Sequence, residues 1–159
     1  MTGLAMARAL EHTPLAVTIA KSTWLFPLIE TLHVLAFTVV VGSVAMLDVR
    51  LLGLGNMRRP LHELIRSVLP WTWIAFIVAA ICGALLFSSK ASTYYVNLPF
   101  RIKFACLALA AVNMIVFHSG AGDIPNLGRL PARARIAGVI SLILWLAIVA
   151  SGRWIGFTT

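Results

Sequence analysis

Two ionisable residues, Glu30 and His33, stand one helical turn apart in a strongly apolar stretch of the chain, WLFPLIETLHVLAF. Side chains three residues apart in a helix project from one face. An imidazole that is held by a carboxylate is a good ligand for iron or copper. Since an ionisable group in the apolar part of a membrane is costly, it normally has a partner or a function. The pair therefore predicts either a ligand site or a buried ion pair in which Lys103 or Arg153 neutralises Glu30.

The four histidines indicate haem b as one candidate cofactor. His12 precedes the first apolar run and could approach His33, whereas His62 could approach His118 at the opposite face. Each pair could ligate one haem, which would place one haem near each face of the membrane. Because a helix rises about 1.5 Å per residue, His33 and His118 lie in opposite leaflets and cannot share a haem.

A second candidate ligand set combines His33 with Cys82 and Cys106, which are expected at a similar depth in the membrane. Imidazole and thiolate ligands together suit Cu(I) or Zn. Lone buried cysteines are ordinarily packing residues, and the sequence contains no CxxC or HExxH motif that would strengthen the metal interpretation. Haem b and copper therefore both remain candidate cofactors.

The other intramembrane polar residues permit a different function. They could line a polar path in a transporter of small solutes, ions or protons. If every buried charge is only paired, the protein is instead a structural or assembly subunit of a membrane complex without a cofactor. No nucleophile–base spacing or phosphate-binding glycine loop is present, so a self-contained enzyme is not expected. The residues of the possible path are Glu30, Asp48, Lys103, Asn113 and Arg153.

The composition indicates which elements must position these groups. Hydrophobic residues make up 60% of the chain and charged residues 11%, whereas a soluble domain carries about 25% charged residues. A chain so poor in charge must turn its apolar surface to membrane lipid. The net charge of +8 comes from basic residues between the apolar runs, where they meet anionic lipid headgroups. Nucleic acid is therefore not an expected partner.

Four apolar runs are long enough to cross a bilayer, whose apolar core of about 30 Å needs roughly 20 helical residues. We predict an all-α protein, an integral membrane antiparallel four-helix bundle over residues 23–159, preceded by an amphipathic surface helix over residues 1–22. The expected spans are residues 24–52, 64–88, 99–118 and 136–157.

The distribution of basic residues predicts the orientation of the chain. The loops between the first and second and between the third and fourth spans carry more Lys and Arg than the other side, so they are expected in the cytoplasm and both termini outside it. The expected location is a bacterial inner membrane, with a protein partner in a membrane complex and possible homo-oligomers. The basic residues assigned to the cytoplasmic side are Arg50, Arg58, Arg59, Arg66, Arg129, Arg133 and Arg135, against Arg8, Lys21 and Lys90 on the other side. The other side also gains Arg101, Lys103 and Arg153 if residues at the helix ends are counted, and the difference then narrows to a single residue.

Several strings together resemble a bacterial family of small four-helix membrane proteins that carries a domain-of-unknown-function label. They are WLFPLIETLHVLAF, GSVAMLDVRLLGL, PWTWIAF, PFRIKF, NMIVFH and SGRWI, of which LDVRLLGL is the most specific part. The layout is similar to CopD-type copper-resistance membrane domains and, more loosely, to haem-b membrane subunits. The resemblance implies a four-helix inner-membrane protein, and its strings include His33 and His118. The first functional prediction is therefore a cofactor- or metal-handling subunit, which transfers electrons through haem b or handles copper for a partner protein.

Overall fold

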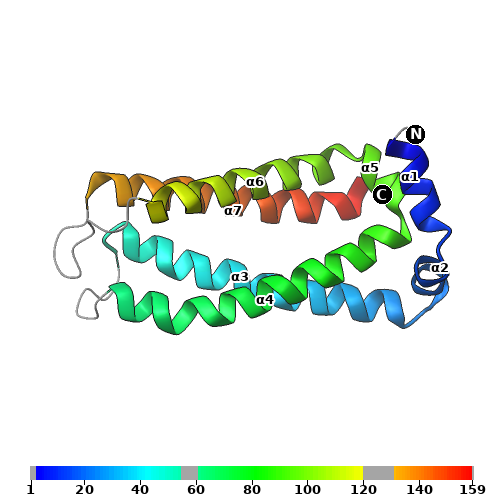
Figure 1. Cartoon of the computed structure of the whole chain (residues 1–159), viewed down its shortest axis with the longest axis horizontal. Helices are drawn as coiled ribbons and strands as arrows, with labels where there is room; N and C mark the ends of the chain where they lie inside the picture. Colours follow the sequence, from blue (N-terminus) through cyan, green and yellow to red (C-terminus); the bar gives the residue numbers. More distant parts are fainter. Residues whose placement is uncertain (1–2, 55–60, 120–130, 159) are drawn as a thin grey trace.

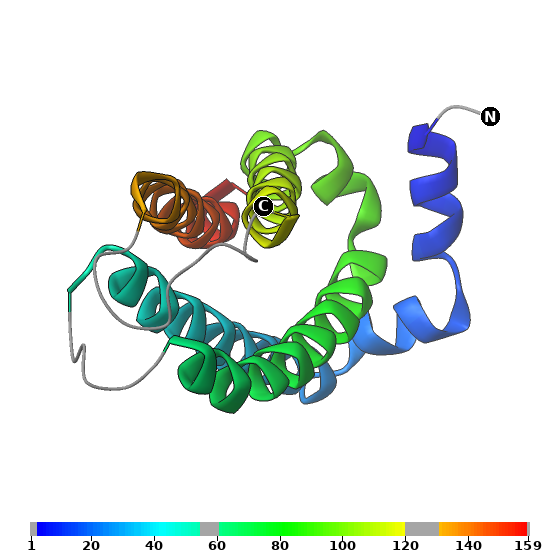
Figure 2. The same ribbon diagram turned by 60° about the vertical axis from the view of Figure 1, so that its left-hand side comes forward.

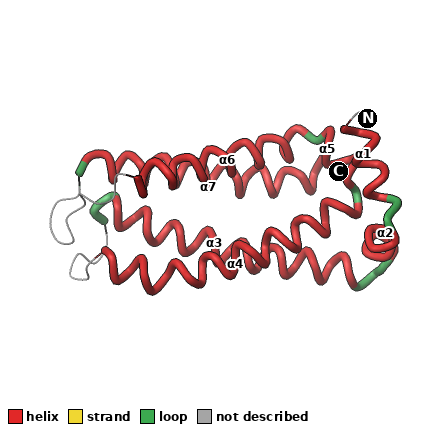
Figure 3. The backbone as a smooth tube through the Cα atoms, in the orientation of Figure 1, coloured by secondary structure: helices red, strands yellow, loops and turns green. Residues whose placement is uncertain are grey.

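A computed structural model describes residues 3–54, 61–119 and 131–158 of the chain, and these residues form helices joined by short connections (Figures 1 and 3). No strand occurs in these three ranges. The helices are α1 (Gly3–Glu11), α2 (Pro14–Lys21), α3 (Leu25–Leu51), α4 (Leu61–Ser89), α5 (Ala91–Val96), α6 (Leu98–Ser119) and α7 (Ala132–Thr158).

The four long apolar helices that the sequence predicts are confirmed. Helices α3, α4, α6 and α7 are each long and apolar enough to cross a membrane, which indicates a multi-pass membrane protein. The largest differences from the expected bounds are at the starts of two helices near charged residues. Helix α4 begins at Leu61 and α7 at Ala132, both earlier in the chain than expected. An apolar run marks only the part of a helix in lipid, whereas Arg133 and Arg135 are compatible with a helix that continues into the headgroup region.

The long helices pack as two pairs, α3 with α4 and α6 with α7 (Figure 1). Contacts between α3 and α7 join the pairs, and we call this contact the seam. In their described parts, the backbones of α4 and α6 do not approach each other closely, although the Phe87 ring of α4 stacks on the Phe100 ring of α6. Helix α3 also diverges from α7 toward the end that carries α1 and α2, and both views show this (Figures 1 and 2). The arrangement is therefore open on one side, unlike a closed four-helix bundle.

The N-terminal segment forms two helices, not the single surface helix that the sequence analysis expects. The break falls at Thr13–Pro14, where Pro14 has no backbone N–H to continue a helix. The Thr13 hydroxyl donates to the Leu10 carbonyl at 2.8 Å and accepts from the Ala16 N–H at 3.4 Å, so it ends α1 and caps α2. Helix α1 packs on α5 and α2 packs on α4. Both therefore lie at one end of the long helices.

A carboxylate fixes α1 to the short helix that follows α4. Glu11 accepts hydrogen bonds from the Ser92 backbone N–H at 2.8 Å and from the Ser92 hydroxyl at 2.9 Å. The backbone N–H groups in the first turn of a helix lack partners within the helix. Glu11 satisfies one of these N–H groups in α5. This hydrogen bond holds α5, the short helix between α4 and α6, against α1.

Candidate functional site

His33 lies half-buried on α3 and forms a hydrogen bond across to α4. Its Nδ1 atom is 2.8 Å from the backbone carbonyl oxygen of Ala79. A carbonyl only accepts, so Nδ1 must donate and carry the ring proton. In the neutral imidazole the lone pair is then on Nε2. Histidines that ligate a metal commonly donate the N–H of their other ring nitrogen to a backbone carbonyl in this way.

Phe37, one turn along α3, gathers residues from the other helix pair around His33. Its ring stacks on the imidazole with a centroid distance of 6.1 Å. The Nζ atom of Lys103 on α6 lies 5.2 Å from the centroid of the Phe37 ring, and the Trp145 ring on α7 lies 5.9 Å from it. One aromatic ring therefore brings α3, α6 and α7 together beside His33.

Lys103 places a positive charge in this part of the membrane span. The side chain is half-buried and passes Gly152, where an added Cβ would lie 3.7 Å from Nζ. Within the described residues it makes no ion pair, and the face of Phe37 stabilises the ammonium group instead. Lys103 is also close enough to His33 to act on the imidazole electrostatically. Glu30 also acts on the imidazole, but more weakly than Lys103, so the charge beside the ring favours a ligand that carries negative charge.

Glu30 does not form the buried ion pair that the sequence analysis expects. It is exposed on α3, Lys103 lies over Phe37, and the Arg153 guanidinium lies 5.1 Å from the Phe157 ring centroid. A physical reason is that α3, which carries Glu30, diverges from α7 toward the end with α1 and α2 (Figure 1).

Glu30 instead acts on α5. Burial, and secondarily the negative charge of Glu30, raise the pKa of the Tyr94 phenol above its ordinary value. The Tyr94 phenol, which is protonated at neutral pH in any case, therefore keeps its proton further into the alkaline range.

The proposed metal set of His33, Cys82 and Cys106 is not assembled. Across residues 3–54, 61–119 and 131–158, no three His, Cys, Asp or Glu side chains lie close enough to hold one metal ion. Gly83 is the residue of α4 that faces the His33 ring, and neighbouring residues in a helix point about 100° apart. Cys82 is buried and Cys106 half-buried, both as free thiols, as packing residues are.

The predicted pair of His12 with His33 is not formed, and the predicted pair of His62 with His118 involves a side chain outside the described part of the structure. His12 is exposed between α1 and α2, whereas His33 points to α4. His62 is exposed in the first turn of α4. His118 is in α6, but its side chain lies outside the described part of the structure. His33 is thus the histidine for which the structure gives a defined environment.

The remaining residues of the possible polar path lie in two separate groups. Lys103 and Arg153 lie toward the end with α1 and α2. Asp48 and Asn113 lie in the other half, where the Asn113 amide donates to the Ala137 carbonyl at 3.0 Å and joins α6 to α7. Asp48 is buried and has a side-chain hydrogen bond with Ser141 on α7. Both inner residues are therefore engaged in helix contacts.

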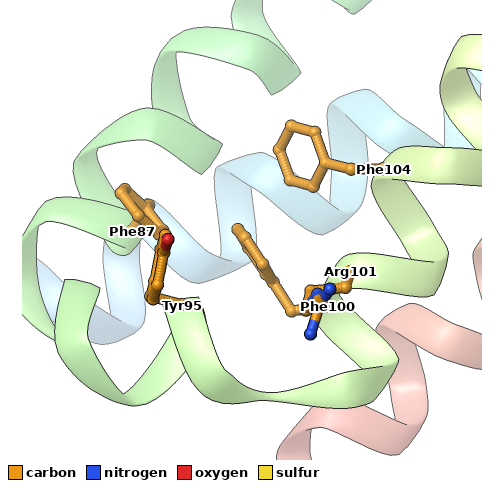
Figure 4. Close-up of a pocket in the computed structure, with 5 residues that line it drawn as sticks. All are labelled: Phe87, Tyr95, Phe100, Arg101 and Phe104. Atoms are coloured by element: carbon orange, nitrogen blue, oxygen red, sulfur yellow. The ribbon is translucent and has the colours of Figure 1, made fainter. Parts of the chain in front are cut away.

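An aromatic pocket of about 380 Å³ lies where α4, α5 and α6 meet (Figure 4). The rings of Phe87 and Phe100 stack at a centroid distance of 5.3 Å, and Phe104 follows at 4.8 Å from Phe100. Tyr95 and Arg101 contribute the polar groups of the lining. The sequence analysis missed this pocket, although the recurring aromatics around the third span were a signal for it.

The pocket lies close to His33 along α4. Phe87 follows Gly83 by four residues, so the two positions share a face of the helix. Because Gly83 faces His33, the pocket begins one turn further toward α5. The aromatic side chains of the pocket therefore follow the His33 imidazole in the direction of α1.

Gly83 provides the space that the His33 ring occupies. A Cβ at this position would lie 3.0 Å from Cε1 of His33. We expect Gly83→Ala to lower the free energy of unfolding by about 1 kcal/mol, because the ring must shift from its hydrogen bond with Ala79. Gly42→Ala, which meets nothing within 4 Å, is the matched control and should raise it by about 0.5 kcal/mol. Unfolding in mixed detergent micelles measures both.

A double-mutant cycle tests the cause of that loss. In a His33→Ala background the ring is absent, so Gly83→Ala should become as favourable as Gly42→Ala. An unchanged loss in that background would contradict the assigned contact.

Comparison with known proteins gives a single family. A model described as a family of unknown function, DUF6644, matches residues 23–158. No curated protein and no solved structure matches the chain. The match includes all four long helices and the His33 site, and the chain is therefore a member of the DUF6644 family.

Proposed function

We propose that this protein is a haem b-binding membrane subunit that transfers electrons for a partner protein, in which His33 would hold the haem iron. The observation that carries the proposal is the hydrogen bond from His33 Nδ1 to the Ala79 carbonyl. This bond fixes the tautomer and the ring orientation, and it leaves Nε2 as a ligand for iron.

The charge of Lys103 favours haem over copper or zinc. A bare metal cation beside His33 would be repelled by the neighbouring ammonium group and would lack the two thiolates that the sequence suggested. Haem b carries two propionates, and Lys103 is a cation without a carboxylate partner among the described residues. An anionic cofactor would thus neutralise a charge that is otherwise costly in the membrane.

The aromatic surroundings also suit a flat macrocycle. Phe37 and Trp145 lie beside the imidazole, and the pocket of Phe87, Phe100 and Phe104 adds apolar walls. Gly83 and Gly152 let the side chains of His33 and Lys103 pack closely against α4 and α7. When bound, haem b would supply reversible one-electron transfer, while these residues would bind it, orient it and exclude water.

We further propose a bacterial inner membrane as the location, with both termini outside the cytoplasm. The antiparallel course of the helices and the layout similar to CopD-type domains are part of this proposal. Helices α1 and α2 would lie at the outer surface, where α1 has an exposed polar side with Arg8 and the neighbouring His12. The partner would contact this end, because the proposed electron carrier lies in the same half of the membrane.

An absorption spectrum of the purified full-length protein tests the proposal. Protein expressed with sufficient haem supply should show a Soret band when oxidised and α and β bands after reduction with dithionite, with iron and protein in a fixed ratio. A colourless, iron-free protein would reject the haem function and favour a cofactor-free assembly role.

Substitution of Lys103 tests how the site holds the cofactor. We expect Lys103→Gln to weaken haem binding by about 10-fold to 100-fold, in the range observed for outer-shell partners of a metal ligand. Lys90→Gln is the matched control, since Lys90 is exposed and lies over Phe26 at 5.9 Å. Haem titration of the apoprotein measures both affinities. Equal affinities in the two variants would remove Lys103 from the binding site.

A further inference from the structure

Asp48 is a buried carboxyl group in the half of the molecule opposite His33. Only 4% of its surface is exposed. One side-chain hydrogen bond, with Ser141 on α7, is assigned to it. Its Oδ2 atom is buried and has no hydrogen-bond partner among the residues that the structure describes.

The carboxyl group lies in the seam, which is the direct packing contact between the two helix pairs. Gly138 on α7 approaches so closely that an added Cβ would be 3.2 Å from the Asp48 carbonyl oxygen and 3.2 Å from Cβ of Leu51. Ala134, one turn earlier on α7, is fully buried against Leu51 and Leu61. Tight packing of small residues thus encloses Asp48 and keeps water from it.

An ionised carboxylate is poorly accommodated in this environment. Transfer of a charge out of water is far more costly than transfer of a neutral acid, unless its oxygens are paired. Among the described residues Ser141 is the side-chain partner that bears on Asp48, and no charged group is shown to offset the burial. The charged and titratable groups on the elements at this end are Arg50 on α3, His62, Glu63 and Arg66 on α4, His118 on α6, and Arg133 and Arg135 on α7.

We propose that Asp48 is a proton-binding site, whose carboxyl group takes up a proton in the mildly acidic range within the seam between the two helix pairs. The site is separate from the haem site and does not depend on it. Oδ2 carries the proton and Oδ1 accepts from Ser141. The proton leaves only when water or a cation enters the seam to stabilise the carboxylate that remains.

Infrared difference spectroscopy of the detergent-purified full-length protein tests this proposal. At mildly acidic pH the wild type should show the carbonyl band of a protonated carboxylic acid, which shifts in heavy water. Asp48→Asn should lose that band completely, whereas Glu63→Gln should retain it, because Glu63 is exposed in the first turn of α4. Circular dichroism would establish that both variants keep their helices.

A second variant separates the proton site from a structural effect. Ser141→Ala retains the carboxyl group and removes its hydrogen-bond partner, so the band should remain and move in frequency. A band of equal intensity in wild type and Asp48→Asn would overturn the proposal, as would a wild-type spectrum without the band. Haem absorbance plays no part in either readout, so failure here and failure of the haem proposal are distinguishable.

Discussion

Replacement of His33 by alanine should abolish the haem spectrum of the purified protein. His33 Nε2 is the ligand that the hydrogen bond to Ala79 leaves available. Loss of the ligand itself should reduce haem affinity by about 100-fold or more, since loss of an outer-shell partner alone costs 10-fold to 100-fold. The Soret absorbance per protein chain, with iron analysis on the same sample, measures the effect.

Two controls make this result specific to the imidazole. His62→Ala removes an exposed histidine from the first turn of α4 and should leave the spectrum unchanged. Added free imidazole should restore part of the Soret band to His33→Ala, because the substitution leaves space at the position of the ring. A full Soret band in His33→Ala without imidazole would assign the axial ligand to another residue.

The second large effect is expected at Gly138, in the seam between the helix pairs. Valine at this position would place its Cβ 3.2 Å from the Asp48 carbonyl oxygen, which is backbone and cannot move without shifting α3. Because α3 and α7 form the direct contact between the pairs, the whole seam would have to separate. We expect the free energy of unfolding to fall by about 3 kcal/mol, at the upper end for an overpacked site.

Gly42→Val is the matched control for that substitution. Gly42 lies within the α3 span and has no atom within 4 Å of an added Cβ, so valine there should change stability little. Unfolding in mixed micelles compares the two variants. If Gly138→Val were as stable as Gly42→Val, α7 could not pack on α3 in the register described.

The sequence alone was sufficient to predict the class of the protein and the extent of its long helices. The apolar runs that become α3, α4, α6 and α7 are local features, because a helix in lipid must satisfy its own backbone hydrogen bonds. His33 was also identified from the sequence, since an imidazole in an apolar run is conspicuous at once.

The partners of these residues depended on the tertiary structure. The carbonyl of Ala79 and the space at Gly83 have no sequence signature, because every residue of a helix has a carbonyl and glycines occur in many contacts. Lys103 and Glu30 seemed to be natural partners by charge and depth, yet α3 diverges from α7 and leaves Glu30 exposed. The angle between two helices depends on how their surfaces pack, so it cannot be predicted from the sequence of either helix alone.

At Thr13–Pro14 the sequence analysis missed a feature that the sequence does contain, the break between α1 and α2. Its signals, a capping threonine before a proline, were local and present in the sequence, but the hydrophobic pattern on both sides suggested one continuous surface helix. What the sequence determined is therefore which segments are helical and which of them enter lipid. Only the tertiary structure decided which helix faces meet, because lipid tails are as apolar as the side chains, so small residues and single polar groups select the contacts.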